Sequence, residues 1–230
     1  MTETLPQGEA KVRAVREMFD TIAPRYDLVN RVMTFGLDVR WRKQATRALA
    51  LPPGSTVLDI AAGTGDFCRE LQRAGHVAVG IDLSFGMLAN ARTTAPLLQG
   101  DALRMPVRGG GADGVTCGFA LRNLVELQPF FDELGRVLRP GGRIALLDVA
   151  RPVNPILRTG HAVYFGSVVP KIGALLNRKG ASAYAFLPKS AAYLPEGDVM
   201  VEMLRSAGFP DASRRLLSAG ITQLLTGTRA

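Results

Sequence analysis

The sequence predicts a doubly wound α/β fold built on a mostly parallel, seven-stranded sheet. From Thr56 onward, short apolar runs alternate with stretches of helical periodicity, which is the pattern of successive βαβ units. The first apolar run leads into a glycine-containing turn that opens a helix. The last two runs are separated only by Ser218-Ala219-Gly220, so one terminal strand should run antiparallel to the others.

The first fifty residues differ from the rest because their apolar positions recur at steps of three and four. Pro52-Pro53-Gly54 is the clearest linker, which predicts a helical cap over 1–50 and a main domain over 51–230. Helices are expected at about 12–22, 28–35, 39–49, 66–74, 85–93, 128–138 and 198–207. Strands are expected at 56–61, 77–81, 97–100, 114–117, 143–149, 212–217 and 221–226, with an insertion at 152–195.

The composition of the chain limits the classes of partner and site that we expect. The formal charge of +8 favours anionic cofactors, phosphates or lipid headgroups as partners. Arginines are scattered and aromatic residues make up only 7% of the chain, so we expect no nucleic-acid partner. Cys68 and Cys117 are too few for a disulfide framework or a zinc site, so both are expected in the core, with no metal.

The location expected from the sequence is cytoplasmic. The chain starts without an apolar leader, and no segment approaches the roughly 18 apolar residues of a spanning helix. The insertion, however, is apolar and edged by Arg158, Lys171, Arg178 and Lys179, which suits either a plain lid or an entrance facing a membrane surface. Weak peripheral membrane association is therefore expected, and a homodimer stays open. The apolar residues of the insertion are Ile156, Leu157, Val163, Tyr164, Phe165, Val168, Val169, Ile172 and Leu175.

The glycine turn is the strongest candidate for a functional site. Gly63 and Gly65 let the backbone approach a ligand at a helix N-terminus. Asp82 follows about 20 residues later, at the end of the second strand, where a carboxylate can accept hydrogen bonds from ribose hydroxyls. The third glycine of a dinucleotide fingerprint is missing, because Cys68 occupies its place. Asp101 follows the third strand, where an adenine amino group could be held.

These motifs resemble class I S-adenosylmethionine methyltransferases in order and spacing: VLDIAAGTGDF (57–67), GIDLS (80–84), QGDALRMP (99–106) and LRPGGRIALLDV (138–149). Further stretches are similar to the family that C-methylates demethylmenaquinol and related ubiquinone precursors. They are MFD (18–20), IAPRYD (22–27), Asn30, FGL (35–37), Trp41-Arg42, FALRN (119–123), YAFLPKS (184–190) and AGF (207–209).

The resemblance implies S-adenosyl-L-methionine as cofactor and C-methylation of a lipophilic quinol, above all conversion of demethylmenaquinol to menaquinol. Arg122 and Asn123 are the catalytic candidates, and Tyr26, Arg122 and Tyr184 are the candidates for acceptor binding. The glycine turn, the strand ends and the resemblance together indicate which residues bind the cofactor. These candidates are Asp59, Ala61, Gly63, Thr64, Gly65, Asp82, Leu83, Asp101, Ala102 and Gly118.

Several of these residues have a second interpretation. Asp59 could cap the turn instead of touching the cofactor. Arg122 could hold a quinol oxygen or form a structural ion pair. Asn123 could orient a hydroxyl or cap the next helix. His161, in the insertion, could contact the acceptor.

The sequence also departs from the family pattern. Gly118 stands where a serine is usual, and Ala120 replaces a glycine of the following motif. Asp38 begins a pair that usually contains histidine, Leu225 replaces a histidine, and residues 148–152 are a looser version of E-F-S-x-P. These departures bear on the acceptor more than on the cofactor. The alternatives are therefore a different apolar acceptor, a non-catalytic cofactor-binding protein, or a nucleic-acid-modifying protein.

Overall fold

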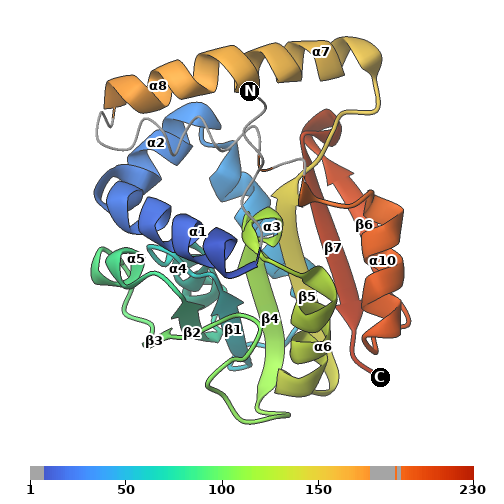
Figure 1. The fold of residues 1–230 in the computed structure, drawn as a ribbon. Helices are drawn as coiled ribbons and strands as arrows, with labels where there is room; N and C mark the ends of the chain where they lie inside the picture. Colours follow the sequence, from blue (N-terminus) through green and yellow to red (C-terminus); the bar gives the residue numbers. More distant parts are fainter. Residues whose placement is uncertain (1–7, 177–189, 191–192) are drawn as a thin grey trace.

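A seven-stranded sheet forms the centre of the molecule, in the order β3-β2-β1-β4-β5-β7-β6 (Figure 1). The structure is a computed structural model, and it describes residues 8–176, 190 and 193–230. β7 is antiparallel to both neighbours, and the other pairs are parallel, as predicted. The strands are β1 (Thr56–Ile60), β2 (Val77–Asp82), β3 (Leu97–Gln99), β4 (Ala112–Gly118), β5 (Leu138–Val149), β6 (Ser213–Leu217) and β7 (Thr222–Thr228).

Helices cover both faces of this sheet, because consecutive strand residues point to opposite sides. On β5, Ile144 and Leu146 join one buried cluster with α6 and α10, whereas Ala145 and Leu147 join another with α3 and α4. The helices are α1 (Gly8–Ile22), α2 (Tyr26–Met33), α3 (Leu37–Leu49), α4 (Asp66–Arg73), α5 (Phe85–Ala89), α6 (Leu127–Val137), α7 (Pro155–Val163), α8 (Val169–Leu176) and α10 (Gly197–Ser206). Short helical turns are η1 (Ala23–Arg25), η2 (Leu121–Asn123), η3 (Tyr164–Val168) and η6 (Ser218–Gly220).

Two local expectations were wrong. Helix α5 begins at an N-cap, where the Ser84 side chain accepts from the Met87 amide, but it ends at Ala89 rather than near residue 93. The chain leaves the helix there because the Arg92 amide donates to the carbonyl of Thr64 in the glycine turn. The strand expected at 143–149 begins earlier, at Leu138, with an irregular stretch between two points of pairing with β4.

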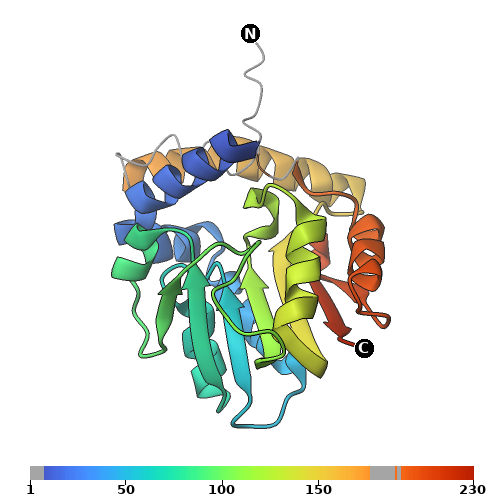
Figure 2. The same ribbon diagram turned by 60° about the horizontal axis from the view of Figure 1, so that its bottom comes forward.

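The N-terminal helices and the insertion lie over one end of the sheet. Helices α7 and α8 form a rod across this end, with α1 beneath it (Figures 1 and 2). A third buried cluster joins Ile22, Val29 and Met33 of the N-terminal segment to Met87 of α5 and Val169 of α8. Among the described helices, none is both long and apolar enough to cross a membrane.

Candidate functional site

A cavity lies at the carboxyl ends of β1, β2 and β4, where a doubly wound sheet binds its ligands. Its other wall comes from α1, which contributes Val12, Val15 and Phe19. Nine of the ten cofactor-binding candidates line it: Asp59, Ala61, Gly63, Thr64, Asp82, Leu83, Asp101, Ala102 and Gly118.

Gly65, the tenth candidate, does not line the cavity. Its φ of +83° suits glycine, and a Cβ atom there would lie 2.6 Å from Cγ2 of Thr93. Gly65 therefore packs closely against Thr93, behind the turn. Gly63 differs: its φ is +56°, and a Cβ would meet no atom within 4 Å, so its backbone faces open space.

Asp82 is fixed at the end of β2 by two backbone amides. Its Oδ2 accepts from Gly63 N at 2.7 Å and its Oδ1 from Ser84 N at 2.8 Å. Burial raises the pKa of Asp82, and these two hydrogen bonds oppose that rise. Each carboxylate oxygen keeps a lone pair for another donor.

Asp59 sits deeper, with 1% of its surface exposed. It accepts hydrogen bonds from the side chains of Thr116, at 3.0 Å, and Cys68, at 3.5 Å. Burial raises its pKa to about 7, against the lowering effect of these bonds and of the Arg42 charge. Asp59 thus holds β1 to β4 and α4 while it lines the floor of the cavity. As expected, both cysteines are buried and free.

A group of charged side chains, called here the charge cluster, joins α2 and α3 to the glycine turn. Asp66, at the start of α4, pairs with Arg31, Arg42 and Arg69. Burial raises the pKa of Asp66, but the three guanidinium groups hold it below its ordinary value. The cluster comprises Asp27, Arg31, Asp38, Arg42, Asp66 and Arg69, with Asp27 also bound to the hydroxyl of Thr64.

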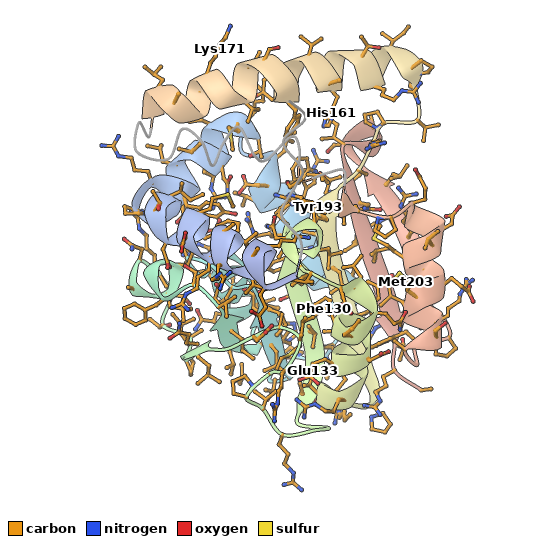
Figure 3. All side chains as sticks on the ribbon, in the orientation of Figure 1. Phe130, Glu133, His161, Lys171, Tyr193 and Met203 are labelled. Atoms are coloured by element: carbon orange, nitrogen blue, oxygen red, sulfur yellow. The ribbon has the colours of Figure 1, made fainter. Side chains whose placement is uncertain are left out.

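A second cavity opens under the α7–α8 rod. It is larger than the first, about 1040 Å³ against about 140 Å³. Aromatic and aliphatic side chains dominate its wall, including Phe35, Trp41, Tyr164 and Phe165. His161 also lines it; Figure 3 shows this residue on the inner side of the rod, opposite Lys171. The predicted apolar insertion thus roofs a cavity beside the cofactor candidates.

Arg122 lines this second cavity and also forms a buried ion pair. Its Nη1 lies 2.5 Å from Oδ1 of Asp148, and its Nε donates to Oγ of Ser190 at 3.2 Å. Both sequence interpretations of Arg122 are compatible with this position. Asn123 lines the first cavity instead, and its buried Oδ1 accepts from no described residue.

The two cavities meet at Tyr26, Arg42 and Phe119, which line both. Tyr26 was a predicted acceptor residue, whereas no role was predicted for Arg42 or Phe119. Helical periodicity carried no signal for Arg42, since a charged residue on α3 is expected to face solvent. Its only sequence signal was its place in the Trp41-Arg42 pair of the family resemblance. Tyr184, the remaining acceptor candidate, lies outside the described residues.

The first cavity fits the expected cofactor. Gly63 leaves room for a close approach, Asp82 offers acceptors for ribose hydroxyls, and the Asn123 oxygen lacks a partner among described residues. Asp101 is exposed at the rim, with Oδ1 accepting from the Leu103 amide.

The departures from the family pattern have different consequences. A side chain at Gly118 would place its Cβ 3.0 Å from the ring of Phe67, so this position is tight. Ala120 and Leu225 are buried in the core on the α6 face, and Leu225 lines neither cavity. Gly118 and Ala120 also line the first cavity, and Asp38 lines the second, where it is buried against Arg42.

Comparison with known proteins agrees with this geometry. The sequence model of the ubiE/COQ5 methyltransferase family matches residues 7–229. The demethylmenaquinone methyltransferase of Roseiflexus castenholzii is 41% identical over 99% of this chain and 98% of its own length. The Deinococcus radiodurans protein of the same name is 42% identical over 95% of this chain and 94% of its own.

Solved structures support the fold. An S-adenosylmethionine-dependent methyltransferase of Thermotoga maritima matches with a TM-score of 0.67 at 19% identity, over 94% of this chain and all of its own. A phosphoethanolamine N-methyltransferase of Haemonchus contortus, solved with S-adenosylhomocysteine, has a TM-score of 0.63 at 17% identity, over 89% of this chain and 46% of its own. The predictions of fold, enzyme class and methyl donor are confirmed. This chain belongs to the ubiE/COQ5 methyltransferase family and is an S-adenosylmethionine-dependent methyltransferase.

Proposed function

We propose that the protein methylates a ring carbon of a lipid quinol, with demethylmenaquinol as the acceptor and menaquinol as the product. The observation that carries this proposal is the meeting of two unlike cavities at Tyr26, Arg42 and Phe119. One holds the polar groups expected for a nucleoside, and the other is large and mainly apolar. Relatives that cover nearly all of this chain carry the name demethylmenaquinone methyltransferase.

S-adenosylmethionine supplies an activated methyl group on a positively charged sulfur. Asp82 would bind the ribose hydroxyls, and the backbone at Gly63 would adjoin the methionine portion. Arg122, in the apolar cavity, would stabilise an ionised ring hydroxyl, which raises electron density on the ring carbon. The roof and α1 exclude water. Overall, the S–C bond breaks, a C–C bond forms, and the ring carbon releases its proton to solvent.

Direct assay tests this proposal. The protein is incubated with methyl-labelled S-adenosylmethionine and a panel of reduced demethylquinones, and the methylated atom is assigned by mass spectrometry and NMR. We expect one new C–methyl group on the quinol ring. Labelled oxygen, or transfer only to apolar acceptors without a quinol ring, would contradict the proposal and favour the second acceptor class.

We further propose that the acceptor enters from a membrane surface. Phe35, Ile156 and Leu157 line the acceptor cavity and are also exposed, by 79%, 82% and 47%. The mouth of the cavity is therefore rimmed by apolar side chains. Residues 151–176 contain Arg151, Arg158 and Lys171 but neither Asp nor Glu. This combination favours anionic lipid headgroups over a purely aqueous contact.

A further inference from the structure

Arg42 holds a position at the site that its ion pairs alone do not account for. The side chain projects from α3 and is 7% exposed. Its Nη1 donates to Oδ2 of Asp38 at 2.6 Å and lies 3.4 Å from Oδ2 of Asp66. No described residue accepts a hydrogen bond from its Nη2 or Nε atoms. Arg42 therefore retains N–H donors while it lines both cavities.

The charge cluster keeps this guanidinium in place. It contains three arginines and three aspartates, so the formal charges cancel. Arg31 pairs with the same two carboxylates as Arg42, but it lines neither cavity. Asp38, which departs from the family pattern, is 1% exposed and forms ion pairs with both arginines. Arg42 is the one arginine of the cluster that faces the junction.

Tyr26 carries a phenol at this junction, so its pKa shows which groups act on a phenol hydroxyl there. Burial raises the pKa of the Tyr26 hydroxyl, and the Asp66 charge adds to that rise. A hydrogen bond from Asn30 and the charges of Arg42 and Arg122 lower it. The pKa of Tyr26 stays above its ordinary value because burial outweighs the other effects, and the two guanidinium groups limit this rise by favouring an ionised oxygen where the cavities meet.

We propose that Arg42 binds an ionised hydroxyl oxygen of the acceptor ring, together with Arg122, at the junction of the two cavities. This inference rests on the proposed function, because it takes the acceptor to be a hydroquinone. The hydroxyl proton passes to solvent, and the negative oxygen receives a charge-assisted hydrogen bond from a free guanidinium N–H. Asp38 is then a positioning residue, which holds Arg42 without occupying those donors.

The test compares Arg42→Gln with Arg31→Gln. Both remove one positive charge from the same pair of carboxylates, but only Arg42 reaches the cavities. The probe is a nitrophenol, whose absorption shows whether its hydroxyl is ionised. We expect the unmodified protein and Arg31→Gln to ionise the bound probe at lower pH than in free solution, and Arg42→Gln to lose most of this shift. With demethylmenaquinol, kcat of Arg42→Gln should fall roughly a hundredfold, as when one donor to a developing oxyanion is removed.

Arg42→Lys is a further control, because it keeps the positive charge. Thermal unfolding and calorimetric binding of S-adenosylmethionine show whether each variant is folded. Arg42→Lys should ionise the probe more than Arg42→Gln does. Equal behaviour of Arg42→Gln and Arg31→Gln, or no shift of the probe in the unmodified protein, would overturn the inference. Failure of the unmodified protein to methylate any quinol would instead overturn the proposed function, and the probe titration would still decide whether Arg42 binds phenolates.

Discussion

At the scale of single residues, two aspartates on neighbouring strands differ in role because they differ in position. Asp59 lies one residue before the end of β1, and Asp82 ends β2, at the same edge of the sheet. Among the described residues, Asp59 accepts only from side chains behind the site, and burial raises its pKa to about 7. Asp82 instead accepts from backbone amides at the cavity wall. Of the two, Asp82 is therefore the better placed to bind a ligand.

Replacing Asp82 with Ala should weaken S-adenosylmethionine binding, because the ribose hydroxyls lose a charged acceptor. Loss of such a hydrogen bond costs about 1.5 to 3 kcal/mol, which is roughly a tenfold to hundredfold weaker Kd. Isothermal titration calorimetry measures it. Asp211→Ala is the matched control, since Asp211 also accepts from a backbone amide, that of Thr228, but lines neither cavity. Equal losses in both variants would remove Asp82 from the binding site.

At the scale of elements, the α7–α8 rod shows which apolar residues of the insertion are free. Val169 is fully buried, and Tyr164, Phe165 and Ile172 pack against the cluster beneath the rod. These four residues therefore lie on the inner side of the rod and not on its exposed face. Other apolar positions of the rod remain exposed, namely Ile156, Leu157, Val163, Val168 and Leu175.

A double substitution, Val163→Ser with Leu175→Ser, should therefore weaken binding to vesicles that contain phosphatidylglycerol. Both residues are exposed, by 59% and 76%, and neither lines the acceptor cavity. Losing two apolar side chains from the interface should reduce vesicle affinity roughly tenfold. Vesicle flotation at low and high salt measures this affinity. We expect the protein to leave the vesicles as salt rises, because salt screens the attraction between its cations and the anionic lipid.

Val199→Ser with Leu216→Ser is the matched control, because it removes the same residue types from exposed positions on α10 and β6. The control should float like the unmodified protein. If the two double variants bind vesicles equally, the rod is a lid without a membrane role.

At the scale of the whole molecule, helix α1 completes the wall of the first cavity. The Asp20 carboxylate of α1 accepts from Oγ of Ser84 at 2.5 Å and from the Gly86 amide at 2.8 Å. On the same helix, Lys11 donates to the carbonyl of Leu124 and lies over the ring of Tyr193. Helix α1 therefore closes one wall of the cavity through contacts at both of its ends.

Gly86→Ala should loosen this wall. The new Cβ would lie 2.9 Å from the Cα of Asp20, so α1 must shift, and overpacking of this kind costs about 1 to 3 kcal/mol. We expect faster proteolysis within α1 and faster release of S-adenosylmethionine in stopped-flow fluorescence. Gly160→Ala is the control, because a Cβ there meets no atom within 4 Å. Unchanged proteolysis and release in Gly86→Ala would show that this contact does not hold α1 in place.

The sequence by itself determined the sheet, its antiparallel terminal strand and most of the residues that share the first cavity. Hydrophobic periodicity and glycine turns are local signals, and strand ends of a parallel sheet meet at one edge whatever the side chains are. That is why nine of the ten cofactor candidates share a cavity. The exception, Gly65, shows the limit, because a glycine needed for packing and one needed for ligand approach look alike in a sequence.

Only the tertiary structure decided the acceptor side. Which apolar residues of the rod are buried depends on contacts with α2 and α5, which are distant in sequence. Arg42 became part of the site because Asp38 and Asp66, on two different helices, hold its guanidinium at the junction of two cavities. The Asp38–Arg42 pair has i,i+4 spacing within α3, which a sequence can suggest. The pair with Asp66 of α4 joins segments that are distant in sequence, so its placement has to be read from the folded chain.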